Sequence, residues 1–273
     1  MKESRKREIR SKAYTFRKKC KVNRYGILDL FKECEQQGYK LLRYPLGEDA
    51  DLGFVMNKDE DVVIVTNTSN RLAREIFTLA HEIGHIVLHM KSSDSFVDDA
   101  ITISVRSTDE KEQEANYFAA CLLMPEEEVD RFLDLEIVDF KRQGLSAMDI
   151  ARIMSEFNVS FETAINRLEA LGKIDSNARI KLDDQRNQRR VSNLLKSVGG
   201  NRRLNEANQE IEIPHEYLEY VIFNYNRCAI PEETLKRALA YYQLSIDDIN
   251  DRLKQEDEDE EDDFEELIGG LTE

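Results

Sequence analysis

One segment constrains the fold more than any other, because its apolar residues recur at spacings of three and four between Leu72 and Met90. This spacing predicts a single long amphipathic helix with one stripe against a core. The polar run at 67–70 offers side chains that can cap its start. The stripe consists of Leu72, Ile76, Leu79, Ile83, Val87 and Met90.

The segments around this helix predict an α+β fold. Runs rich in β-branched and aromatic residues predict a small, mostly antiparallel sheet, with strands at 39–44, 53–56 and 62–66. Helical patterns flank the sheet, at 4–38, at 109–124 and onward to about residue 171. The segment Ala115–Met124 has no polar side, so we expect it to be buried all round.

The chain divides into four predicted parts. Residues 1–174 form a first domain with a basic N-terminal helix, and 175–210, rich in Asn, Gln and Arg, form a linker or flexible arm. Residues 211–254 form a second helical region, and 255–273 form an acidic, disordered tail. Residues 145–168 are echoed at 230–253 with a constant offset of 85, which either a shared helix-turn-helix-like hairpin or chance explains.

Composition narrows the class of protein. Apolar residues make up 41% and charged residues 34%, which is typical of a globular protein with a charged surface. No segment approaches the roughly 18 apolar residues that a membrane span needs. The cysteines lie far apart and form no CxxC pair, which favours a reducing, cytoplasmic compartment over a disulfide framework. They are Cys20, Cys34, Cys121 and Cys228.

The net charge of −16 is unevenly distributed. Glu256–Glu266 holds ten acidic residues in eleven positions, whereas Met1–Lys21 holds ten Lys or Arg against two Glu. Both ends are expected to be solvated. Direct nucleic-acid binding is unlikely on this pattern, because the acidic tail would oppose phosphate contacts.

The long helix contains the sequence His81-Glu82-Ile-Gly-His85. Residues four apart lie one turn apart on the same face, so two imidazoles can bind one metal ion. Glu82 is beside them, where it can take a proton from a metal-bound water. Only four histidines occur in the chain, so an HExxH sequence by chance is improbable. The pattern predicts a zinc site with Glu82 as the catalytic residue.

A catalytic zinc site needs a third protein ligand, usually from another helix. Glu114 is the predicted ligand, because it is on the same face of its helix as Phe118 and Cys121 and a carboxylate there would be costly to bury unpaired. His89 is the rival, but three ligands at i, i+4 and i+8 span about 12 Å of a straight helix. His89 and Tyr117 are also candidates for stabilising an oxyanion.

These residues resemble a known family. His81-Glu-Ile-Gly-His85, followed by Glu114-Ala-Asn-x-Phe-Ala-x-x-Leu-Leu-Met-Pro125, is similar to the ImmA/IrrE family of zinc metallopeptidases. The resemblance extends from roughly Leu41 to Leu171. It implies a zincin-like domain in which His81, His85 and Glu114 hold zinc.

The resemblance also implies a function. It predicts a zinc-dependent endopeptidase whose protein substrate is a helix-turn-helix transcriptional repressor, so that cleavage relieves repression. The alternative is a zinc-stabilised anti-repressor that binds and sequesters its partner without cutting it. The HExxH sequence favours the enzyme, because a purely structural zinc site usually has four protein ligands.

Overall fold

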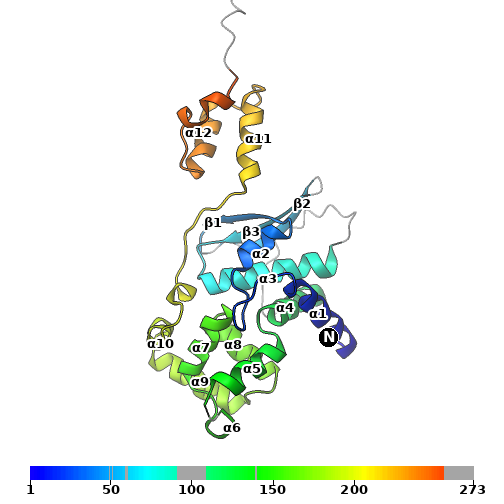
Figure 1. Ribbon diagram of the computed structural model, residues 1–273, viewed down its shortest axis with the longest axis vertical. Coiled ribbons are helices and arrows are strands. Elements are labelled where there is room, and N and C mark those ends of the chain that lie inside the picture. The colour runs from blue at the N-terminus through cyan, green and yellow to red at the C-terminus, as the bar shows by residue number, and fades with distance from the viewer. Residues whose placement is uncertain (49, 51, 59–60, 91–108, 139, 255–273) are drawn as a thin grey trace, which may run out of the picture. The chain divides into compact units, whose positions relative to one another are not determined.

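The computed structural model describes residues 1–48, 50, 52–58, 61–90, 109–138 and 140–254. The chain forms two compact units, Met1–Glu212 and Ile213–Glu273 (Figure 1). The polar stretch at 91–107 and the predicted tail at 255–273 lie outside the described residues.

The first unit is a mixture of helices around a small sheet, which confirms the predicted α+β class. Its elements are α1 (Glu3–Arg17), α2 (Leu30–Gln36), β1 (Lys40–Tyr44), β2 (Gly53–Lys58), β3 (Asp61–Asn67), α3 (Leu72–His89), α4 (Glu110–Leu123), α5 (Glu126–Glu136), α6 (Phe140–Gln143), α7 (Ala147–Phe157), α8 (Phe161–Ala170), α9 (Ser176–Gln188), α10 (Val191–Ser197) and the short 3₁₀ helix η1 (Arg202–Asn205). None of the helices formed by the described residues has both the length and the apolar character needed to cross a membrane.

The helical region predicted at 4–38 is two helices, α1 and α2, with a turn between them. The side chain of Asn23 accepts hydrogen bonds from the backbone N–H groups of Tyr25 and Gly26 at 2.9 and 2.7 Å. A Cβ on Gly26 would lie 2.1 Å from the carbonyl oxygen of Glu156, so only glycine allows this close approach. This turn lies in the segment that separates the two helices.

The sheet has the strand order β1-β3-β2. β2 and β3 are antiparallel, with Gly53 opposite Thr66, but β1 and β3 are parallel, with Lys40 opposite Val63. The small sheet is confirmed, and the antiparallel expectation holds for one of its two strand pairs. α3 follows β3 directly and runs along the sheet (Figure 1).

Two glycines bring α3 close to its neighbours. A Cβ on Gly53 of β2 would lie 2.6 Å from the methyl carbon of Thr78 on α3. A Cβ on Gly84, inside the HExxH sequence, would lie 3.1 Å from the Cα of Ala115 on α4. Both positions therefore need a residue without a side chain for α3 to pack tightly between the sheet and α4.

We predict that Gly84→Val destabilises the protein by about 1–3 kcal/mol, because overpacking a tight contact between helices forces them apart. Arg74→Val is the control, since Arg74 is exposed on the same helix and its replacement introduces a β-branched residue without the contact. Chemical denaturation measures both free energies of unfolding. Equal losses in the two variants would contradict the role of Gly84.

The prediction of a linker or flexible arm at 175–210 is wrong. These residues form α9, α10 and η1, and Asp175 caps α9 by accepting a hydrogen bond from the backbone N–H of Ala178 at 2.8 Å. Few apolar residues occur here, but those present are buried in the core of the first unit, where they offset the cost of ordering a polar segment. The buried residues are Leu182, Leu194, Leu195 and Leu204.

The second unit is helical, as predicted, with α11 (His215–Tyr225), α12 (Glu232–Tyr241) and the 3₁₀ helix η2 (Asp247–Arg252). It has its own small core, formed by Leu218, Val221, Ile222, Leu235, Ala238, Leu239 and Ile249.

The segments 145–168 and 230–253, which the sequence relates by an offset of 85 residues, share backbone features. Asn158 after α7 and Gln243 after α12 both adopt the left-handed conformation, with φ of 55° and 57°. Ser160 and Ser245, two residues later, each form a hydrogen bond at the start of the following helix. The matching positions therefore share a helix–turn–helix hairpin, although its second helix is α-helical in α8 and 3₁₀ in η2.

Candidate metal centre

α3 places its two predicted ligands together. His81 and His85 lie one turn apart, and their Nε2 atoms are 2.9 Å from each other. His81 is completely buried and His85 is 8% exposed. The helix is buried on this side because α4 packs against it at Gly84 and Ala115. The HExxH sequence therefore lies at the contact between two helices rather than on an open surface.

The third member of the site is an acidic residue, Glu112, in the first turn of α4. Its Oε2 atom is 3.3 Å from Nε2 of His81, and its Oε1 atom is 3.1 Å from Nε2 of His85. Among the described residues, His81, His85 and Glu112 form a cluster whose possible ligand atoms all lie within 4.8 Å of one another.

This cluster fits a zinc ion. Zinc binds histidine nitrogen and carboxylate oxygen at about 2.0–2.2 Å in a tetrahedral arrangement, which places neighbouring ligand atoms about 3.3 Å apart. The three separations between His81, His85 and Glu112 run from 2.9 to 3.3 Å. Two imidazoles and one carboxylate are also the donor set of many catalytic zinc sites, which keep a fourth position for water or substrate.

The structure does not bring Glu114 to His81 and His85, so the predicted third ligand is corrected to Glu112. Residues two apart on a helix point about 200° apart, so the two carboxylates make different contacts. Glu114 is indeed buried and paired, but its partner is Arg5 of α1, at 2.7 Å from Nε and 2.5 Å from Nη2. The positive charge that a buried carboxylate requires is supplied by a guanidinium.

Neither of the two other candidates is part of the cluster. Nε2 of His89 is 3.7 Å from Oε2 of Glu114, and His89 is not part of the metal cluster. The hydroxyl of Tyr117 accepts a hydrogen bond from Arg10 at 3.3 Å. A role for either residue in oxyanion stabilisation stays a prediction.

Asn116 is a site residue that was missed from the sequence. Its Oδ1 atom lies 3.0 Å from Nδ1 of His81. A carboxamide oxygen only accepts hydrogen bonds, so this contact keeps the hydrogen of His81 on Nδ1 and leaves the Nε2 lone pair facing the cluster. The signal was its position four residues after Glu112, which puts both side chains on one face of α4.

The charges of the cluster suit metal binding. Burial lowers the pKa of His81, which keeps the imidazole neutral as a metal ligand must be. Burial opposes ionisation of Glu112, but hydrogen bonds with His81 and His85 outweigh it and hold the pKa of this carboxyl at about 2. Glu112 is therefore an anion facing the imidazoles of His81 and His85.

Glu82 is the most unusual group of the site. Its carboxyl is fully buried, and neither oxygen has a hydrogen-bond partner among the described residues. Burial, reinforced by the charge of Glu112, raises the pKa of Glu82 to about 8. A Cβ on Gly53 would lie 3.8 Å from Oε1 of Glu82, so this glycine keeps the strand close to the carboxyl without covering it with a side chain.

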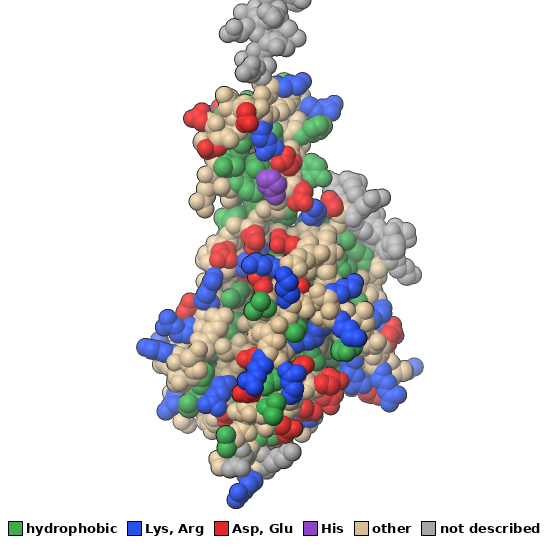
Figure 2. Space-filling model, viewed as in Figure 1, with side chains coloured by type: hydrophobic (Ala, Val, Ile, Leu, Met, Phe, Trp, Pro, Cys, Tyr) green, Lys and Arg blue, Asp and Glu red, His purple; other side chains and the backbone are tan. Residues whose placement is uncertain are grey.

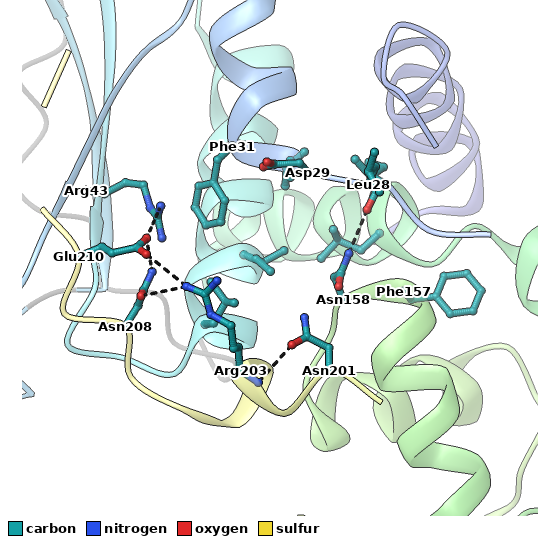
Figure 3. Close-up of a pocket in the computed structure, with 15 residues that line it drawn as sticks. Leu28, Asp29, Phe31, Arg43, Phe157, Asn158, Asn201, Arg203, Asn208 and Glu210 are labelled. Atoms are coloured by element: carbon teal, nitrogen blue, oxygen red, sulfur yellow. Dashed lines mark hydrogen bonds and ion pairs between the residues drawn. The ribbon is translucent and has the colours of Figure 1, made fainter. Parts of the chain in front are cut away.

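A separate cavity of about 320 Å³ lies elsewhere in the first unit and includes none of the cluster residues. Figure 3 shows Arg43 and Arg203 bonded to Glu210 along its rim, with Asn208 beside them. Arg43 also forms a buried bidentate pair with Glu75 of α3, at 2.8 and 3.1 Å. The polar side chains that line the cavity therefore bond to one another. Arg43 of β1 in this way attaches the 201–212 segment to the sheet and to α3.

Comparison with known proteins gives two matches. Residues 34–169 match the family model of peptidase M78, described as the IrrE N-terminal-like domain. The chain is also similar to "Uncharacterized immunity region protein 2" of Bacillus phage phi105, at 33% identity over 85 residues. That similarity covers 31% of this chain and 52% of the phage protein, so the chain spans about half the length of the relative it matches.

The match to the family model includes α3 and α4, the two helices that carry the metal cluster. It begins after α1, which supplies Arg5, and ends before α9. Residues 34–169 of this chain are an IrrE N-terminal-like domain, which confirms the resemblance to the ImmA/IrrE family.

Proposed function

We propose that the protein is a zinc-dependent endopeptidase. One observation carries this proposal: the buried Glu82 carboxyl has no hydrogen-bond partner among the residues that the structure describes, and it lies beside three groups that suit zinc. A buried polar group without a partner is costly, so it calls for a ligand, and a water molecule held at the fourth position of the metal would supply one. A purely structural site would not need such a group.

Each residue has a defined role in this proposal. His81, His85 and Glu112 hold the zinc ion, and Asn116 orients His81. Zinc, when bound, lowers the pKa of a coordinated water to about 7 and polarises the scissile carbonyl. Glu82 accepts a proton on its carboxylate and delivers it to the nitrogen of the leaving amine.

The proposed substrate is a regulatory protein, most specifically a helix-turn-helix transcriptional repressor. The family resemblance and the similarity to a phage protein named for an immunity region support this class. All four cysteines are free, which agrees with the proposed cytoplasmic location. Lys and Arg side chains are interspersed with Asp and Glu over the face seen in Figure 2, a pattern that favours a protein partner over nucleic acid.

The burial of the site supports a second candidate function. His81 and Glu82 are both 0% exposed, and a polypeptide has to reach them to be cut. A protein that binds its repressor without cleaving it would need no such access. The alternative is therefore a zinc-stabilised anti-repressor that sequesters its partner.

One experiment separates the two functions. Lysate of the source cells is treated with the zinc-loaded wild type or with zinc-loaded Glu82→Gln, and new protein N-termini are compared. We expect a cut in a helix-turn-helix repressor that appears only with the wild type. If no cut depends on Glu82 and a repressor co-purifies with both forms, the endopeptidase proposal is wrong and sequestration is favoured.

A further inference from the structure

The N-terminal helix α1 lies outside the segment that matches the family model, yet it packs against the metal-binding helix α4 (Figure 1). Its apolar residues Ile9, Ala13 and Phe16 are buried in the core of the first unit. Arg17, at the end of the helix, donates a hydrogen bond to the carbonyl oxygen of Leu122, near the end of α4, at 3.1 Å. α1 is therefore an integral part of this unit.

The other end of α1 holds the first turns of α4. Arg5 binds Glu114 with two parallel hydrogen bonds, the bidentate arrangement that fixes direction as well as distance. Glu114 is 6% exposed and the Arg5 side chain is 29% exposed, so water reaches this pair mainly from the Arg5 side.

The direction of Glu114 determines the direction of Glu112. The two residues belong to the same helix and point about 200° apart, so a rotation that turned Glu114 away from Arg5 would also turn Glu112 away from His81 and His85. The distances from Glu112 to the two imidazoles, 3.3 and 3.1 Å, hold only at one rotation of α4. Arg5 holds Glu114 while His81 and His85 contact Glu112, so the two sets of contacts together fix the rotation of α4.

We propose that Arg5 is a positioning residue for the metal centre. Its bidentate pair with Glu114 sets the rotation of α4, so that Glu112 faces the histidines, and it neutralises a second buried carboxylate that would otherwise compete for the cation. This role rests on the metal centre proposed above, but it concerns zinc binding rather than peptide cleavage.

The test measures zinc affinity by competition with a chelator. We expect Arg5→Met to weaken zinc binding by about tenfold, because Arg5 acts on Glu112 only through α4 and even a direct outer partner of a metal ligand is worth about 10–100-fold. Arg5→Lys should recover part of the loss, because it restores the charge but not the bidentate geometry. Replacement of zinc by Co²⁺ gives a visible spectrum that reports the ligand geometry, and we expect this spectrum to shift in Arg5→Met.

Arg10→Met is the matched control, because Arg10 belongs to the same helix and contacts Tyr117 of α4 rather than Glu114. We expect Arg10→Met to keep the wild-type zinc affinity and Co²⁺ spectrum. The double variant Arg5→Met/Glu114→Gln should bind zinc no more weakly than Arg5→Met, because both changes act through one pair.

Three results would overturn the positioning role. They are unchanged zinc affinity in Arg5→Met, equal losses in Arg5→Met and Arg10→Met, and additive losses in the double variant. Zinc binding by the wild type is measured first. If the wild type binds zinc and Arg5→Met binds it equally well, only the role of Arg5 fails, whereas a wild type that binds no zinc overturns the metal centre as well.

Discussion

Glu82→Gln is expected to lower the rate of substrate cleavage by about 10²–10⁴-fold, the range that a positioned acid–base group contributes. Gln has nearly the same shape as Glu but cannot accept a proton from water or deliver one to an amine. The fully buried position of Glu82 means that few other groups can take over the transfer. The measurement is the single-turnover rate on the substrate identified in lysate.

Metal content separates this chemical effect from damage to the site. Glu82 is not part of the cluster of His81, His85 and Glu112, so the variant should bind zinc as the wild type does. Its stability should stay close to that of the wild type, because the raised pKa of Glu82 leaves its carboxyl largely neutral near pH 7 and a neutral amide of the same shape replaces it. A variant that keeps its zinc and still cleaves at the wild-type rate would remove Glu82 from the mechanism.

Much of the site was predictable because it is local. The spacing of His81 and His85, the position of Glu82 and the helix that carries them follow from the geometry of one turn. The helix predicted to begin near the polar run at 67–70 is α3, which begins at Leu72; Arg71 is its N-cap residue and forms no side-chain cap, so the predicted capping by 67–70 is wrong. A short-range pattern of this kind does not depend on how the rest of the chain packs.

The third ligand was not predictable in this way, because it depends on the packing of two helices. Glu112 and Glu114 are both acidic residues near the start of α4, and the sequence does not state which side of this helix faces α3. Apolar neighbours favoured Glu114 as the buried residue, and it is buried, but so is Glu112. The deciding facts are the close contact at Gly84 and the pairing of Glu114 with Arg5, 109 positions away.

Residues 175–210 show a second limit of local patterns. Their composition is typical of a linker, since polar residues predominate and no long apolar stripe recurs. Four leucines nevertheless suffice to attach this segment to the core, and the polar rim at Asn201 and Arg203 adds hydrogen bonds. Sparse apolar residues stabilise a segment when a core formed elsewhere in the chain receives them.

Glu112→Ala is expected to weaken zinc binding by more than about 100-fold, because it removes a direct ligand and even an outer partner is worth about 10–100-fold. Glu114→Ala should weaken zinc binding by about tenfold or less, since Glu114 contacts Arg5 rather than the cluster. Chelator competition measures both affinities under the same conditions. Ala is used in both variants so that each loses its whole carboxyl.

The comparison of these two variants decides between ligand sets, because both remove one buried negative charge from the same helix. A general loss of stability would weaken zinc binding in both variants, whereas the loss of a metal ligand would weaken it strongly in only one of them. Thermal unfolding of the zinc-free proteins provides the control, and we expect Glu114→Ala to unfold at the lower temperature because Arg5 loses its buried partner. Stronger zinc loss in Glu114→Ala than in Glu112→Ala would restore the ligand set His81, His85 and Glu114 and would require α4 to rotate when the metal binds.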